Sequence, residues 1–277
     1  YINGPAEIKN NFLARRAWLE ISLEQLRLNT QALLNALPPH CGLMAVVKAD
    51  AYGLGAVPVS QFLNQMGVDS FAVSTIDEGI SLRRHGIKGE ILILGYTDIA
   101  RARELKRYKL TQTAIDYPYA LALNNAGFGL KVHAAIDTGM KRLGIQPQNK
   151  EELLALFKLP RLKVTGVYSH LCDSFSREKE SLEFTKEQID RFNQMLDYLK
   201  RSGIKLPPAH LQSSYGLLNF PQLNYSRVRS AAVLFGLLDY PDTALKLEIQ
   251  PVVSLKARVA MLKHIKAGES VGYGREF

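Results

Sequence analysis

The sequence predicts an α/β fold, a (β/α)8 barrel followed by the first strands of a C-terminal β domain. Short apolar runs alternate with amphipathic helical stretches over most of the chain, a pattern typical of parallel sheets covered by helices. The length of 277 residues accommodates one barrel of about 250 residues and a remainder. After about Lys246 the pattern changes to an alternation of apolar and polar residues, which indicates a different kind of sheet.

Eight apolar runs are the candidate strands of the barrel. Several of them have no period of two, as expected for strands that are buried on both faces of a parallel sheet. A doubly wound open sheet would give the same alternation, but no GxGxxG motif follows any run, which disfavours its dinucleotide-binding form. In chain order the runs are Leu43–Val47, Ser70–Val73, Ile91–Leu94, Leu110–Ile115, Leu130–Ile136, Val164–Ser169, Ala209–Gln212 and Val228–Phe235.

The helical stretches between the runs carry start and stop signals. A leading helix extends to Leu37, where two prolines end it. A later helix over Phe184–Arg201 places its apolar residues on one stripe. Capping residues followed three positions later by Glu or Gln predict helix starts at Ser22 with Gln25, Thr75 with Glu78, and Thr185 with Gln188.

Residues 14–245 are predicted to form the barrel and residues 246–277 to begin the β domain. Between Val253 and Met261 apolar residues alternate with polar ones, which is the pattern of a half-buried antiparallel strand. Turn-forming residues follow at 266–269, and a second short strand is predicted over Ser270–Tyr273. We therefore expect the chain to stop inside an incomplete β domain.

Composition and charge exclude several classes of protein. Hydrophobic residues make up 47% of the chain and charged residues 22%, the balance of an ordinary globular protein. The two cysteines exclude a disulfide scaffold and a cysteine-rich zinc site, and they suit a reducing cytoplasm. The net charge of +9 comes from scattered Lys and Arg without an aromatic-basic motif, so no nucleic-acid partner is expected. Because the first residue is Tyr1 rather than Met, we expect a piece of a longer polypeptide.

Lys48 is the first candidate for chemistry. The active site of a barrel lies at the carboxyl ends of its strands, and Lys48 directly follows the apolar residues of the first predicted strand. Burial of an amine lowers its pKa and leaves it free to form a Schiff base. The alternative is a strand-end lysine that reaches solvent, and the residue types alone do not separate the two interpretations.

Four further polar sites follow later strands. Arg142 lies in a glycine-containing loop and can bind an anionic or phenolic oxygen. His170 ends the sixth strand, where a structural hydrogen bond is the commoner role. Ser213–Ser214 end the seventh strand and either cap a turn or bind phosphate, which barrels often hold near their last strands. Arg229 lies in an apolar strand, where a guanidinium without partners would be strongly destabilising.

Two motifs resemble those of the alanine racemases, a family of fold-type III pyridoxal-phosphate enzymes. The run Val46–Gly55 resembles the family's cofactor attachment motif, and the run Asp137–Gly144 resembles its DTGMxRLG signature. The segments around His170 and His210 follow in the family's order. The resemblance extends from about Trp18 to the last residue and implies a (β/α)8 barrel.

Within the family, two runs most resemble the membrane-bound serine/alanine racemases of vancomycin resistance (VanT type). These are His210–Asn219 and Ser169–Cys172. The resemblance implies a cytoplasmic catalytic part, here the cytosolic part of a longer membrane-anchored protein. It also implies a head-to-tail homodimer of the full protein, in which each barrel is completed by the partner's β domain.

The resemblance assigns a role to each matching residue. Lys48 would carry pyridoxal 5'-phosphate as a Schiff base and act as one of two catalytic bases. Arg142 would hold the region of the cofactor's phenolic oxygen and help to place the substrate carboxylate. Arg229 would face the pyridine nitrogen and keep it unprotonated, because arginine stays ionised. The other implied cofactor-binding residues are Tyr52 and Ser214 at the phosphate, with backbone amides near Ala231 and Ala232, and His170 beside the ring. No metal is implied.

Three positions depart from the family's pattern. The family often pairs Arg142 with a carbamylated lysine, and Ala135 stands at that place here. Ala231 replaces a glycine of the phosphate loop, which changes how closely backbone approaches phosphate. The second catalytic base, a tyrosine in a GYxDG-type motif, would lie beyond Phe277, and Tyr273 is not assigned to that role.

The sequence thus predicts an isomerase, a racemase that interconverts the L and D forms of alanine and/or serine for peptidoglycan precursor synthesis. The alternatives are a non-enzymatic pyridoxal-phosphate carrier, an amino-acid decarboxylase of the same barrel family, and a Schiff-base aldolase barrel. The DTGMxRLG run and the started β domain argue against the carrier. The choice between alanine and serine is not decided by these residues.

Overall fold

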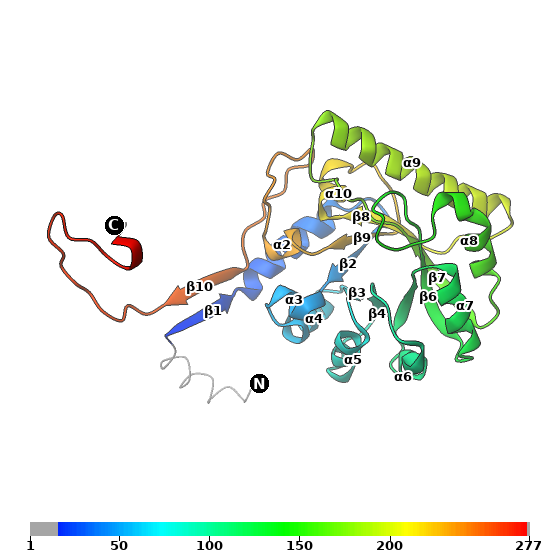
Figure 1. The fold of residues 1–277 in the computed structure, drawn as a ribbon, viewed down its shortest axis with the longest axis horizontal. Helices are drawn as coiled ribbons and strands as arrows, with labels where there is room; N and C mark the ends of the chain where they lie inside the picture. Colours follow the sequence, from blue (N-terminus) through cyan, green and yellow to red (C-terminus); the bar gives the residue numbers. More distant parts are fainter. Residues whose placement is uncertain (1–15, 276–277) are drawn as a thin grey trace. The chain divides into compact units, whose positions relative to one another are not determined.

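The structure is a computed structural model that describes residues 16–275 in two units. One unit is the segment Ser22–Val252, and the other consists of residues 16–21 and 253–275. Figure 1 shows the elements in chain order. The predicted domains, 14–245 and 246–277, begin and end on residues outside the described part (14, 15, 276 and 277).

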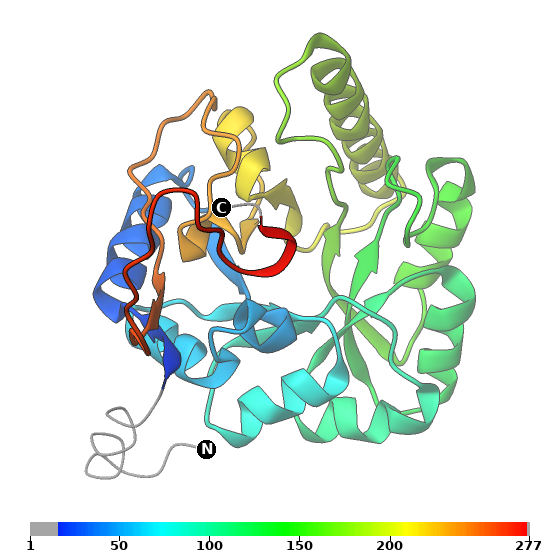
Figure 2. The same ribbon diagram turned by 60° about the vertical axis from the view of Figure 1, so that its left-hand side comes forward.

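Eight parallel strands close into a barrel in the first unit, and helices surround them (Figure 2). Each strand pairs with the next in the chain, and β9 pairs with β2 to close the ring. This confirms the predicted (β/α)8 barrel, since every predicted run overlaps one of the strands. The strands are β2 Gly42–Val46, β3 Ser70–Val73, β4 Glu90–Ile93, β5 Thr111–Ala114, β6 Leu130–Ala135, β7 Leu162–Tyr168, β8 Ala209–Ser213 and β9 Arg227–Ser230.

The last predicted run, Val228–Phe235, is wrong in its second half. Strand β9 ends at Ser230, and Val233–Phe235 form the short 3-10 helix η3. Gly236 follows η3 with a φ of 86°, and a Cβ there would lie 1.9 Å from the carbonyl oxygen of Gln250. The close approach of two backbone segments therefore turns an apolar run away from the sheet.

The helices begin largely where their capping residues predict. Ser22 accepts a hydrogen bond from the backbone of Gln25, and Thr75 with Glu78 forms a complete capping box. The start predicted at Thr185 is wrong, because this buried residue lies inside α9, which begins at Lys179. The helices are α2 Leu23–Ala36, α3 Lys48–Tyr52, α4 Ala56–Gln65, α5 Ile76–Arg84, α6 Ala102–Arg107, α7 Tyr117–Asn125, α8 Lys150–Phe157, α9 Lys179–Arg201 and α10 Ser214–Asn219.

Short 3-10 helices complete the helical elements, at η1 Ile99–Arg101, η2 Pro147–Asn149, η3 and η4 Tyr273–Arg275. Within residues 16–275, no helix combines the length and the apolar character that crossing a lipid bilayer requires.

A left-handed turn follows β2 directly and is labelled α3 in Figure 1. Four consecutive residues other than glycine, Ala49–Tyr52, have φ angles of 50°, 54°, 52° and 58°. Each such residue costs about 1–2 kcal/mol, so strain is stored at the end of the strand. In addition to its backbone hydrogen bonds, two side chains hold the turn: the Ala49 N–H donates to Glu78 (2.6 Å), and the Ala56 N–H donates to Asp50 (2.7 Å).

The second unit contains an antiparallel pair, β1 Ala17–Ile21 with β10 Val253–Ala257. The half-buried strand predicted between Val253 and Met261 is wrong in extent and burial, since β10 ends at Ala257 and Leu255 is 76% exposed. The strand predicted over Ser270–Tyr273 is also wrong, because the described residues after Ala257 form no strand. Glycines with positive φ at 268, 272 and 274 interrupt the extended backbone there.

Candidate active site

One cavity of about 460 Å³ opens at the carboxyl ends of the barrel strands. The structure brings every predicted site residue to its wall, although these residues follow five different strands of the barrel. They are Lys48, Tyr52, Arg142, His170, Ser214, Arg229, Ala231 and Ala232. Their individual roles remain predictions.

Lys48 lies half-buried at the end of β2, where the left-handed turn begins. Its ammonium group makes no hydrogen bond or ion pair with any other residue of the described chain. Glu78 holds the turn after Lys48, because one of its carboxylate oxygens accepts from Ala49 and the other from Ser74 and Thr75. A free amine on a rigid strand end is therefore available to a ligand in the cavity.

The loop after β6 is folded around the side chain of Asp137. One carboxylate oxygen of Asp137 accepts hydrogen bonds from the backbone of Gly139 and Lys141, both at 3.0 Å. A Cβ on Gly144 would lie 2.6 Å from the Asp137 nitrogen, so only glycine permits this close approach. The Asp137 carboxylate and the close backbone approach at Gly144 together fix the conformation of the loop.

Helix α9 ties this loop to the one after β7. The Gln188 amide donates to Thr138 Oγ1 and to the His170 carbonyl, both at 3.2 Å, and its oxygen accepts from Cys172. Arg191 donates to the Thr138 carbonyl at 2.9 Å. Sequence analysis missed this role of Gln188 because it treated the residue as part of a helix cap.

Arg142 reaches the cavity from this loop and is exposed. Within residues 16–275, no hydrogen bond or ion pair joins Arg142 to another residue. Ala135, which stands where the family often has a lysine, is buried and also lines the cavity. Among the described residues Arg142 is thus a cation without a counter-charge, and it lines the same cavity as Ala135.

Arg229 also lines the cavity and is buried at 5% exposure. Nη1 contacts His210 Nδ1 at 2.7 Å, while Nη2 contacts the Ser169 carbonyl at 2.7 Å, His170 Nδ1 at 3.0 Å and the Leu211 carbonyl at 3.2 Å. Burial lowers the pKa of Arg229 to about 10, so it remains charged at neutral pH. Its Nε makes no hydrogen bond to the described residues, which leaves the Nε–H for a ligand.

His170 is held neutral by its surroundings. Burial, together with the positive charges of Arg229, Arg142 and Lys48, lowers the pKa of His170 to about 3. Because Arg229 donates to Nδ1, the proton of the His170 imidazole lies on Nε2. Tyr168 is buried, stacks on the His210 ring and shares a hydrogen bond with Thr113, and no feature of the sequence singled it out.

Small residues at the ends of β8 and β9 form a cradle of hydroxyl and backbone N–H groups. Ser214 and Ser230 contact each other through their hydroxyls at 2.9 Å, and the Ala231 N–H lies 3.4 Å from Ser214. Ala231 and Ala232 line the cavity at the start of η3. Hydroxyls and backbone N–H groups at a short turn are suited to phosphate.

Tyr52 is 49% exposed beside this cradle, and burial of the rest of its side chain raises the pKa of its phenol. Its ring centroid lies 6.0 Å from that of Phe235, in η3. No group of three or more His, Cys, Asp or Glu side chains in the described part of the chain is placed to hold a metal ion.

An amine, a buried guanidinium and the cradle at the ends of β8 and β9 thus share one cavity at the mouth of a (β/α)8 barrel. These features place the chain in the class of (β/α)8 barrels with a ligand cavity at the carboxyl ends of their strands.

Comparison with known proteins narrows this class to one family. A family model described as "Alanine racemase, N-terminal domain" matches residues 21–239, and the chain therefore belongs to the alanine racemase family. This confirms the resemblance carried by the runs Val46–Gly55 and Asp137–Gly144.

Two similar relatives come from enterococci. An amino-acid racemase of Enterococcus faecalis is 45% identical over 275 residues, which cover 99% of this chain and 38% of the relative. A serine/alanine racemase of Enterococcus gallinarum is 44% identical over 263 residues, 94% of this chain and 38% of the relative. The chain spans less than two-fifths of the length of these two relatives.

Solved structures give the same family. An alanine racemase of Clostridium difficile 630 superposes with a TM-score of 0.84 at 32% identity, covering 90% of this chain and 70% of that one. An alanine racemase of E. faecalis gives a TM-score of 0.83 at 27% identity, covering 95% of this chain and 71% of that one.

Proposed function

We propose that this chain is the cofactor-binding barrel of a pyridoxal-phosphate-dependent racemase that interconverts the L and D forms of alanine and/or serine. The observation that carries the proposal is the shared cavity of the unpartnered Lys48 amine, the Ser214 cradle and the buried Arg229. Family membership and the serine/alanine racemase among the relatives support it.

The residues of the cavity fit pyridoxal 5'-phosphate. When bound, this cofactor withdraws electrons from the substrate Cα and makes its proton acidic. Ser214, Tyr52 and the backbone N–H groups of Ala231 and Ala232 would hold the phosphate, and Lys48 would hold the carbonyl carbon covalently.

Arg229 would hold the ring nitrogen through its Nε–H. With a pKa of about 10, Arg229 donates a hydrogen bond at neutral pH but transfers no proton. A ring nitrogen facing it stays unprotonated, which limits how long negative charge persists at the substrate Cα. Short persistence favours return of the proton over side reactions.

Lys48 and Arg142 would act on the substrate. Lys48 removes or returns the Cα proton on one face, and Arg142, which has no protein counter-charge among residues 16–275, binds the substrate carboxylate. Racemisation also needs a proton donor on the other face. We assign that group to the C-terminal β domain of a partner copy in a head-to-tail homodimer of the full protein.

The full protein is proposed to place residues 14–245 in the barrel and to begin the β domain at residue 246. The relatives' greater length supports an extended polypeptide, with this chain as the cytosolic part of a membrane-anchored racemase of the vancomycin-resistance type. Its product would serve peptidoglycan precursor synthesis.

The test is covalent labelling. The chain is incubated with pyridoxal phosphate, reduced with borohydride and digested, and the pyridoxyl group is expected on Lys48 alone. The variant Lys48→Ala should lose the label and the visible absorbance band, whereas Lys186→Ala, an exposed lysine of α9, should keep both. A pyridoxyl group on another lysine would overturn the assignment.

Activity is tested with a longer form of the same protein that includes its β domain. That form should interconvert the enantiomers of alanine or serine, measured by chiral chromatography. Binding of pyridoxal phosphate without interconversion of either amino acid would refute the racemase and leave a carrier.

A further inference from the structure

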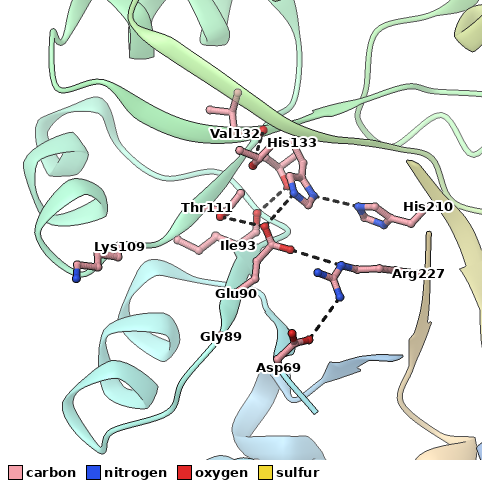
Figure 3. Close-up of polar contacts among 12 residues, drawn as sticks. Asp69, Gly89, Glu90, Ile93, Lys109, Thr111, Val132, His133, His210 and Arg227 are labelled. Carbon is pink, nitrogen blue, oxygen red and sulfur yellow. Dashed lines mark hydrogen bonds and ion pairs between the residues drawn. The ribbon is translucent and has the colours of Figure 1, made fainter. Parts of the chain in front are cut away.

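A line of polar side chains runs through the barrel interior, away from the cavity. Figure 3 shows it from Asp69 through Arg227, Glu90 and His133 to His210. His210 Nε2 lies 3.0 Å from His133 Nδ1, His133 Nε2 lies 3.1 Å from Glu90, and Arg227 lies 3.8 Å from Glu90 and 3.6 Å from Asp69.

The backbone makes room for His133 inside the barrel. The β6–β7 register shifts between Val132 and His133: Val132 pairs with Val164 and His133 with Gly166, so one residue of β7 has no partner on β6. On β7, a Cβ at Gly166 would lie 2.5 Å from His133 Nε2, so only glycine leaves space for the imidazole. His210 also lies at a register shift, between β8 and β9. His133 and His210 are 2% and 0% exposed.

The direction of each hydrogen bond is fixed by its neighbours. Arg229 has only donors, so His210 must accept at Nδ1 and carry its proton on Nε2. His210 then donates to His133 Nδ1, and His133 must carry its proton on Nε2, where it donates to the Glu90 carboxylate. Both ends of the line therefore require the same tautomer of both imidazoles.

The charges along the line agree with this arrangement. Burial raises the pKa of Glu90, but the hydrogen bond and the charge interaction with His133, together with the positive charge of Arg227, more than offset it, so the net shift is downward. Burial and Arg229 hold the pKa of His210 well below its usual range. A proton added to His133 would make Nδ1 a donor toward His210, and His210 would then present N–H to Arg229.

We propose that Glu90 and His133 are positioning residues for Arg229. The carboxylate at the amino-terminal end of β4 fixes the tautomer of both imidazoles, so that His210 offers an acceptor to Nη1 and the guanidinium stays in the cavity wall. The inference deepens the proposed function, in which Arg229 faces the cofactor ring nitrogen. Sequence analysis did not assign a role to either residue.

The opposite tautomers of His133 and His210 show what Glu90 and His133 contribute. With protons on Nδ1 of both imidazoles, two N–H groups would meet at the 2.7 Å contact between His210 and Arg229. Arg229 would have to turn, and its other partners are neutral carbonyls and His170. Of the carboxylates in the described residues, Glu90 is the one that this line joins to the guanidinium.

The first arm of the test measures tautomers in the 277-residue chain without cofactor. Selective ¹⁵N labelling of histidine resolves the nitrogens of the six imidazoles, and His133→Asn and His210→Asn variants assign the two signals. Wild type should show His133 and His210 neutral with protons on Nε2. A proton on Nδ1 of either, or a doubly protonated His133, overturns the proposal whatever the variants do.

Three variants then separate positioning from simple structure. Glu90→Gln keeps an acceptor and should keep the Nε2–H signals. Glu90→Leu removes the acceptor and should replace the single His133 signal by a mixture of tautomers. Asp69→Asn, at the outer end beyond Arg227, should leave the signals of both imidazoles unchanged. Unchanged tautomers in folded Glu90→Leu would refute the role of Glu90.

The second arm uses the chain loaded with pyridoxal phosphate that carries ¹⁵N in its ring. The ring nitrogen signal should shift in Glu90→Leu and stay in place in Glu90→Gln and Asp69→Asn. If no cofactor binds, the proposed function fails while the first arm still reports on the line. If the cofactor binds and its ring nitrogen signal is unchanged in Glu90→Leu, the positioning role of Glu90 is refuted while the proposed function stands.

Discussion

Replacement of Gly166 by alanine is expected to destabilise the barrel strongly, although the position looks permissive in the sequence. The added methyl would lie 2.5–2.6 Å from three atoms of the His133 ring. Ordinary contacts are about 3.5–4.0 Å, so the ring must move by about 1 Å. That movement breaks the bonds to His210 and Glu90, and each buried polar group left unpaired costs about 1–3 kcal/mol. We expect a loss of about 2–5 kcal/mol in the free energy of unfolding.

The assay is urea unfolding followed by far-ultraviolet circular dichroism, carried out in two backgrounds. With His133→Ala the ring is gone, and Gly166→Ala should then stabilise by about 0.4–1 kcal/mol, because alanine restricts the unfolded chain. Gly166 is not among the residues with positive φ, so its backbone accepts alanine. The sign of the effect should thus reverse between the backgrounds. Equal costs in both, or a cost below about 1 kcal/mol in wild type, would refute the steric argument.

The remaining predictions concern backbone strain and pH. Ala49→Gly should stabilise the chain by about 0.5–1 kcal/mol in urea unfolding, since relief of a left-handed residue outweighs the added freedom of glycine; Ala155→Gly, inside α8, should destabilise it by about 1 kcal/mol. Stability should fall as the pH drops from 7 to 5, because His170 and His210 stay neutral when folded but bind protons near pH 6.5 when unfolded. Each contributes up to about 1.4 kcal/mol per pH unit, so His170→Asn should reduce the slope by that amount, and an unchanged slope would contradict it.

The barrel was predictable because its information is local. Most of the barrel strands lie in short, mainly apolar runs, and each run stands between helices whose periodicity is visible in the sequence. The wrong predictions of where an element begins or ends arose where segments far apart in the sequence determine the local structure. The run to Phe235 turns away because its backbone meets that of Gln250, and Thr185 lies inside a helix because α9 continues back to Lys179.

The cavity wall was predictable for a related reason. Residues such as Lys48 and His170 follow strands, and the carboxyl ends of parallel strands meet at one edge whatever the rest of the fold does. The line of polar side chains from Asp69 to His210 could not be predicted, because His133 lies 43 residues from Glu90 and 77 from His210 in the sequence. A histidine within an apolar run was the available signal, and it does not name its partner.

The left-handed turn after β2 has a consequence for the order in which the barrel folds. Its four residues oppose their own backbone preference, so the segment gains nothing from forming alone. The side chain that holds Ala49 belongs to Glu78, in the next βα unit, and it arrives only when β3 and α5 have docked. The left-handed turn is therefore expected to form after the folding transition state, with φ-values near zero at Ala49 and Ala51. Mutations there should change the unfolding rate and leave the folding rate nearly unaltered.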